Sequence, residues 1–220
     1  MNNEKFEKEI LVVPRDVLFR EKYFQGFMNV EEYNYIPIIL KNSIWVKRKE
    51  AEFNPKYQQI IPYGVIINPK TKRVFVYKRS SEGKYSEKRL YNKISLGVGG
   101  HIEKEDLKNK NSKKNIIESC LIREIKEELN VKNIKKSVLL GFLKLEDNSI
   151  DKDHFGVVYL IHLNNSKISV NKDEIALGKF ISFEELYKLR RFAEGWTSAL
   201  INPLIEHYKN NKNRKKINKK

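Results

Sequence analysis

The sequence predicts an α/β protein in which strands and helices alternate and pack in layers. Three apolar runs, at residues 60–67, 136–145 and 154–163, have the length and composition of buried strands. Residues 115–129 repeat apolar side chains with a helical period, and two further helices are predicted after residue 182. This alternation around a sheet is typical of layered α/β domains.

The elements before the main domain are less regular. Residues 9–14 and 36–46 are β-like runs, and the segment between them has no clear period. We therefore interpret residues 1–58 as an N-terminal extension packed on a main domain at 59–208. Residues 209–220 form a basic tail that we expect to be disordered.

The main domain continues with strands and loops of ordinary length. Ser182 and Glu185 have the spacing of a capping box, in which each side chain bonds to the other residue's backbone N–H. The remaining elements, in chain order, are strand 73–78, loop 79–92, strand 94–100 ending in glycines, strand 179–182, helix 182–190 and helix 194–208.

The composition is that of a globular protein, with 40% hydrophobic and 11% aromatic residues. No apolar run approaches the roughly 20 residues needed to span a bilayer, and the N-terminus lacks the apolar core of a signal peptide. Cys120 is the only cysteine, which excludes an internal disulfide and a cysteine-rich metal site. We expect a cytoplasmic protein without a membrane partner.

Positive charge is concentrated at the C-terminus. The formal net charge is +16, and seven of these charges lie in the last twelve residues, which contain no acid. Two interpretations stay open: a solvated terminus, and an electrostatic contact to RNA or another polyanion. The whole chain is rich in Lys, Asn and Ile, and it contains no recognisable nucleic-acid-binding module.

The predicted helix 115–129 carries acids where apolar residues would be expected. At 100° per residue, Glu124 and Glu128 fall within about 20° of Ile117, on the stripe that should face the sheet, and Glu127 flanks them. Carboxylates crowded on a buried face repel one another unless a cation lies between them. Mg²⁺ prefers such oxygen ligands, although an ordinary charged helix face is the alternative.

Glycines precede this helix at Gly97, Gly99 and Gly100. Because they lack a side chain, their backbone carbonyls and amides can approach a bound group closely. The helix is expected to stop at Asn130, since asparagine tolerates the left-handed conformation of a helix end.

These features together resemble the Nudix (MutT-like) family, whose box reads Gly-x5-Glu-x7-Arg-Glu-U-x-Glu-Glu-x-Gly-U, with U aliphatic. Residues 123–131 match the second half of this box except for Asn130, which replaces a glycine. The chain departs from the pattern by an insertion of nine residues between Gly100 and Arg123, so the first glutamate of the box has no clean equivalent. Its candidate replacements are Glu118, Glu103, Glu105 and Asp106.

The resemblance implies an α/β/α sandwich with a central mixed sheet, and an enzyme that cleaves a diphosphate linkage with Mg²⁺, for which Mn²⁺ is a substitute. By the same resemblance, Glu124, Glu127, Glu128 and the Gly100 carbonyl would hold the metal. Arg123 would orient the carboxylates, and Glu174 is a candidate catalytic base. Gly99, Gly100 and His101 would contact the substrate, a small diphosphate compound of nucleotide origin. Family members are often homodimers.

Three alternatives accompany this interpretation. A metabolite-sensing Nudix domain would bind without turnover, although such domains usually lose box glutamates that this chain keeps. An RNA-directed enzyme would use the basic tail. An isopentenyl diphosphate isomerase needs a cysteine near the glycine loop, whereas Cys120 lies inside the box helix.

Overall fold

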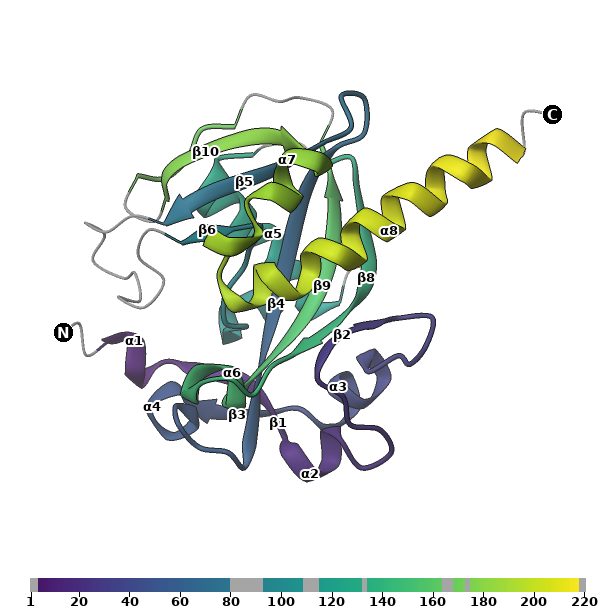
Figure 1. Cartoon of the computed structure of the whole chain (residues 1–220). Helices are drawn as coiled ribbons and strands as arrows, with labels where there is room; N and C mark the ends of the chain where they lie inside the picture. The colour runs from purple at the N-terminus through teal and green to yellow at the C-terminus, as the bar shows by residue number, and fades with distance from the viewer. Residues whose placement is uncertain are drawn as a thin grey trace.

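The computed structural model describes residues 4–79, 93–108, 115–131, 134–163, 168–172 and 175–217. Within these residues ten strands join one sheet, and its main path runs β10-β5-β4-β9-β8-β2 (Figure 1). The strands of this path are β2 Gly26–Asn29, β4 Tyr57–Asn68, β5 Arg73–Arg79, β8 Lys136–Lys144, β9 His154–His162 and β10 Ile175–Ser182.

The sheet is mixed, as predicted. The central pair, β4 and β9, is parallel, with Gln59 opposite His154 and Ile67 opposite His162. The pairs β8–β9, β4–β5 and β5–β10 are antiparallel. The two parallel strands therefore begin at the same end of the sheet, which places Gln59 beside His154.

Helices cover both faces of the sheet, which confirms the α/β/α arrangement. On one face, α5 Ile116–Leu129 packs Leu121 and Ile125 into a core that includes Val157 and Tyr159. On the other face, α7 Phe183–Lys188 and α8 Gly195–Ile217 enclose a second core with Val158 and Leu160. Alternate residues of β9 thus serve the two cores, as the twofold period of a strand requires.

The N-terminal segment adds strands to the same sheet. Strand β1 Glu9–Pro14 lies between β3 Ile44–Lys47 and the first residues of β4. The helices of this segment are α1 Glu4–Glu7, α2 Arg15–Leu18, α3 Ile36–Asn42 and α4 Arg48–Ala51. The division of the chain at residue 58 stays a prediction, since β4 begins at Tyr57.

The expectation of a β-like run at residues 36–46 is wrong for its first part, which forms α3. Pro37 lies in the first helical turn, where its missing N–H costs nothing. The side chain of Asn34 also accepts a hydrogen bond from Ile36 N at 3.0 Å. Only residues 44–47 are extended, because Asn42 and Ser43 end the helix.

The last helix is longer than expected. Helix α8 continues to Ile217, into the segment predicted to be disordered, and its C-terminal part extends away from the sheet in Figure 1. The packed residues Leu200 and Leu204 nucleate the helix. Lysine and arginine, which are good helix formers, then allow it to propagate.

Short elements connect the main ones: β6 Ile94–Ser95, β7 Gly97–Val98, η2 Lys104–Lys108, α6 Ser149–Asp153 and η3 Arg190–Phe192. The capping box of Ser182 and Glu185 is present as predicted. Loop 80–92 and most of the lysine-rich insertion, residues 109–114, lie outside the described residues.

Asn130 ends α5 in the left-handed region, with φ 47° and ψ 38°. Alanine would adopt this left-handed conformation at a cost of about 1 kcal/mol or more, whereas glycine would adopt it without that cost. We expect Asn130→Ala to lower the free energy of unfolding by about 1 kcal/mol and Asn130→Gly to leave it unchanged or raise it, in urea titrations. Equal stabilities of the two variants would contradict this account.

Candidate functional site

The glycine loop lies directly against the box helix. A Cβ atom on Gly100 would be 2.4 Å from Oε1 of Glu124, and one on Gly99 would be 1.8 Å from the carbonyl oxygen of Pro62. The oxygen of Pro62 belongs to the backbone, so only glycine fits at position 99, whereas a side chain at position 100 would displace the carboxylate of Glu124. Both glycines therefore pack directly against other elements of the chain, and their close approach to a bound group stays a prediction.

Glu124 is largely buried. Its side chain is 16% exposed and accepts a hydrogen bond from Nη1 of Arg123 at 2.8 Å. Burial raises the pKa of Glu124 to about 7, although the neighbouring Arg123 opposes this rise. Glu124 is thus a carboxyl group that exchanges its proton near neutral pH.

Glu127 and Glu128 differ in their exposure. The side chain of Glu127 is 59% exposed, and its Oε2 lies 3.3 Å from Nη1 of Arg123. Glu128 is half-buried, and its backbone carbonyl accepts a hydrogen bond from Asn171 N at 2.7 Å. The segment that leads to Glu174 therefore contacts the end of α5, while Glu174 itself lies outside the described residues.

Asp106 takes the place that the sequence left open. Its side chain is 1% exposed and accepts hydrogen bonds from Arg123 Nε at 2.9 Å and Nη2 at 3.1 Å, and from Glu103 N at 2.9 Å. Asp106 is the sixth residue after Gly100, as in the box pattern, and the insertion follows it. Counting forward from Gly100 therefore finds this residue, whereas counting back from Arg123 misses it.

The other candidates for the first glutamate have different partners. Glu103 accepts a hydrogen bond from Lys8 Nζ at 2.6 Å, and Glu105 lies 3.7 Å from Arg123 Nε with its side chain 49% exposed. Glu118 lies in the first turn of α5, where its N–H donates to Asn115 Oδ1 at 3.0 Å. None of the three contacts Arg123 as closely as Asp106 does.

Arg123 joins the loop to the helix. Besides Asp106, Glu124 and Glu127, its guanidinium donates to the carbonyl oxygen of His101 at 3.2 Å. Burial alone would lower the pKa of Arg123, but the Asp106 hydrogen bonds and the charge of Glu124 raise it above its usual value. Arg123 is therefore a permanent cation that fixes the loop relative to the carboxylates.

His101 follows the glycines and turns toward the N-terminal segment. Its Nε2 lies 2.7 Å from Oε1 of Gln59, and its ring centroid lies 5.4 Å from that of His154. Burial, followed by the charge of Arg48 and the proximity of His154, lowers the pKa of His101 well below its usual range. The role of His101 as a substrate contact stays a prediction.

The hollows on the surface of the described part of the chain include one beside the box helix and one on the N-terminal segment. The smaller, of about 340 Å³, borders the box helix and is lined by Glu105, Asp106, Ser119, Ile122, Arg123, Lys126 and Glu127. The larger, of about 840 Å³, lies on the N-terminal segment between Arg15, Tyr23 and Tyr57, outside the glutamate cluster. Because Asp106, Arg123 and Glu127 line the smaller hollow, it is the one that belongs to the candidate site.

The raised pKa of Glu124 predicts a pH dependence of stability in the metal-free protein. Because the folded state holds this proton more tightly than the unfolded state, the contribution is fully present below about pH 4.5 and is lost as the pH rises through about 7. In EDTA, we expect the unfolding free energy of the wild type to fall between pH 5 and 7.5 by up to about 3 kcal/mol more than that of Glu124→Gln. Parallel pH curves in urea titrations would contradict this assignment.

Comparison with known proteins identifies the class to which this fold and loop–helix arrangement belong. The NUDIX domain family matches residues 59–200, so the chain belongs to the Nudix family. Members of this family hydrolyse diphosphate linkages of small molecules and generally use divalent metal ions.

Two relatives resemble nearly the whole chain and not the domain alone. Protein YmaB of Bacillus subtilis (strain 168) is 30% identical over 210 residues, which cover 91% of this chain and 98% of YmaB. The crystal structure of Tm1382, a proposed Nudix hydrolase, superposes with a TM-score of 0.72 at 25% identity, covering 90% of this chain and 99% of Tm1382. DR0079 from Deinococcus radiodurans shares the fold, with a TM-score of 0.52 and 18% identity over 74% of this chain and 90% of DR0079.

The helices of the described segments lack the combination of length and apolar character that is needed to cross a membrane.

Proposed function

We propose that this protein is a Mg²⁺-dependent hydrolase that cleaves the diphosphate bond of a nucleoside diphosphate linked to a further group, by attack of water on phosphorus. The observation that carries the proposal is the buried carboxylate of Glu124, which lies against Gly100 while Arg123 ties the loop to the helix. Burial of an acid in this position is unfavourable, and the ion pair with Arg123 offsets its desolvation only in part.

The donor chemistry of the site fits a hard divalent cation. Glu124, Glu127, Glu128 and the Gly100 carbonyl offer only oxygen atoms, which Mg²⁺ and Mn²⁺ prefer. In the described ranges, no three His, Cys, Asp or Glu side chains converge closely enough to hold an ion by themselves. This fits Mg²⁺, which keeps several waters and is completed by substrate phosphates.

Each residue of the site has a role in this proposal. Glu124, Glu127, Glu128 and Gly100 hold the ion, which would polarise phosphoryl oxygens and lower the pKa of a bound water. Arg123 keeps the carboxylates oriented, and the backbone at Gly99 and Gly100 receives the diphosphate. Glu174 and its neighbour Asp173 are candidates for the general base.

The test is a substrate panel with Mg²⁺: nucleoside triphosphates, ADP-ribose, NADH, sugar nucleotides, dinucleoside polyphosphates, coenzyme A and non-nucleotide diphosphates. Phosphate release is measured by a phosphatase-coupled assay with and without EDTA. We expect turnover of one class, lost in EDTA and in Glu127→Gln, and retained in Glu206→Gln, which alters an exposed acid of α8.

No turnover on the panel, together with tight retention of a metabolite, would instead favour a sensing domain. A cytoplasmic location and a homodimer stay predictions, and gel filtration with light scattering measures the second. The RNA-directed alternative is tested by deleting residues 209–220, which should then abolish a steep salt dependence of polyanion binding.

A further inference from the structure

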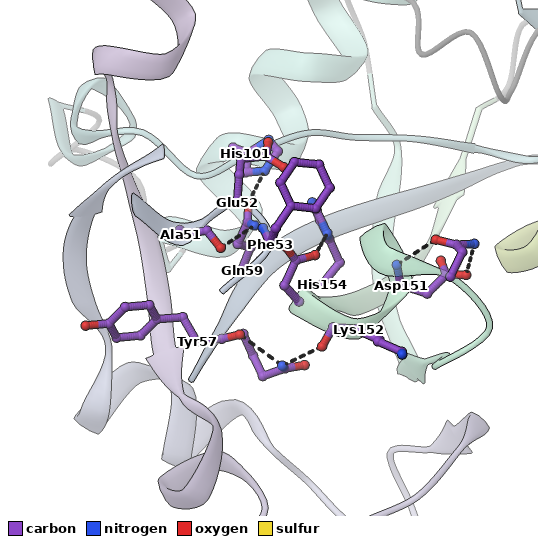
Figure 2. A network of polar contacts seen from close by, with 12 residues as sticks. Ala51, Glu52, Phe53, Tyr57, Gln59, His101, Asp151, Lys152 and His154 are labelled. Carbon is purple, nitrogen blue, oxygen red and sulfur yellow. Dashed lines mark hydrogen bonds and ion pairs between the residues drawn. The ribbon is translucent and has the colours of Figure 1, made fainter. Parts of the chain in front are cut away.

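A chain of buried polar contacts crosses from the N-terminal segment to the glycine loop (Figure 2). It consists of the side chains of Gln59, His101, His154 and Asp153, and we call it the two-histidine network. Its outer ends are backbone groups of Ala51, the last residue of α4, and of Phe53, in the turn that follows.

The first half of the network fixes the ring of His101. Gln59 is fully buried at the start of β4, and its Nε2 donates to the carbonyl oxygen of Ala51 at 3.3 Å. Its Oε1 is then an acceptor, so His101 Nε2 at 2.7 Å carries the hydrogen and donates. The tautomer and the orientation of His101 are set by this bond.

The second half fixes His154. Asp153 is 1% exposed, and its two oxygens accept hydrogen bonds from His154 Nδ1 at 2.8 Å and from Phe53 N at 2.7 Å. His154 meets His101 edge to face, with ring centroids 5.4 Å apart and an interplanar angle of 72°. The two halves are therefore joined by the contact between the two rings.

The turn that anchors the network is held in an unfavourable conformation. Phe53 has φ 57°, in the left-handed region, which costs a bulky residue on the order of 1 kcal/mol or more. Its N–H reaches Asp153 in this conformation, so the buried carboxylate stabilises the turn.

The N-terminal segment also contacts the residues after the glycines, through hydrogen bonds between the two backbones. Leu11 N donates to the carbonyl oxygen of Ile102 at 2.9 Å, and Ile10 forms an isolated bridge with Glu103. On the opposite side, Arg123 donates to the carbonyl oxygen of His101. The peptide after Gly100 is thus clamped between the N-terminal segment and the box helix.

We propose that Gln59 and Asp153 are positioning residues of the metal site, which set the Gly100 carbonyl through the His101–His154 pair. The N-terminal segment therefore contributes to the geometry of the metal site. This proposal rests on the metal binding of the proposed function. Residues of this kind do not touch the ion, but their loss commonly weakens metal binding by 10- to 100-fold.

The test measures Mn²⁺ binding to the purified full-length protein, by the EPR signal of free Mn²⁺, in Gln59→Met, Asp153→Asn and the double variant. We expect each single variant to weaken Mn²⁺ binding about tenfold. Because both substitutions act through the same pair of rings, the double variant should bind Mn²⁺ about as weakly as the single variant with the lower affinity. If the two substitutions instead disturbed the structure independently, their effects would multiply to a loss of Mn²⁺ affinity of about a hundredfold.

Asp151→Asn is the matched control, since Asp151 is a buried acid of the same helix α6 that bonds to Asn148 and not to the network. It should leave Mn²⁺ affinity within twofold of the wild type. Effects of less than twofold in both single variants, multiplying effects, or an equal effect of Asp151→Asn would overturn the proposal. If one variant does not fold in circular dichroism, the other still tests the proposal alone.

Glu124→Gln separates this proposal from the proposed function. If Mn²⁺ binding survives in Glu124→Gln, the metal site itself is elsewhere. If it is lost there but unchanged in Gln59→Met and Asp153→Asn, the metal site stands and the positioning role is wrong.

Discussion

Replacement of Glu124 by glutamine is expected to lower Mg²⁺-dependent turnover by about 10³-fold, which corresponds to about 4 kcal/mol of transition-state stabilisation. The side chain is largely buried and lies directly against Gly100, the residue whose carbonyl is the other proposed ligand. Glutamine keeps the volume and one acceptor for Arg123 but loses the negative charge. The measurement is kcat/KM with the substrate found in the panel.

The same variant should not be less stable than the wild type in EDTA above pH 7. Since burial raises the pKa of Glu124 to about 7, the ionised carboxyl is unfavourable in the metal-free fold, and the neutral amide removes this cost. Lost turnover with unchanged or increased unfolding free energy identifies a functional acid. Lost turnover together with a fall of several kcal/mol in the unfolding free energy would show that Glu124 stabilises the fold instead.

Much of the sheet and its helices could be predicted from local patterns. The strand at 154–163 and the helix at 115–129 are observed as His154–His162 and Ile116–Leu129, and Asn115 caps the helix by accepting from Glu118 N. The helix has a clear period because one side of it faces a core, whereas the strand is a continuous apolar run because both of its faces are buried. The run at 36–46 failed because Ile, Pro and Leu in succession carry no period, and the helix depends on its N-terminal turn.

The site could be predicted only where its residues are close in sequence. The box helix and its glycines lie within one segment, so their spacing identified them. The two-histidine network draws Gln59, His101 and Asp153 from three distant segments, which the pairing of β4 with both β9 and β7 brings together. Asp106 was one of four candidates, because the insertion separates it from Arg123, its partner in the fold.

Asp106→Ala is expected to lower the free energy of unfolding by about 3 kcal/mol and turnover by about 10²-fold. The substitution leaves the guanidinium of Arg123, whose side chain is only 19% exposed, without its two-point acceptor. It also removes the acceptor of Glu103 N. The loop that carries Gly100 would then lose its main attachment to α5, as urea titration and kcat/KM should both report.

Glu105→Ala is the matched control, because Glu105 is the neighbouring acid and also lies near Arg123, at 3.7 Å, but with its side chain 49% exposed. An exposed ion pair of this kind contributes at most about 1 kcal/mol, so the control should stay close to the wild type in stability and turnover. Asp106→Glu, which restores the residue type of the box, should recover most of both. If Asp106→Ala and Glu105→Ala behaved alike, Arg123 would not depend on Asp106, and the first acid of the box would have to be sought beyond the insertion, at Glu118.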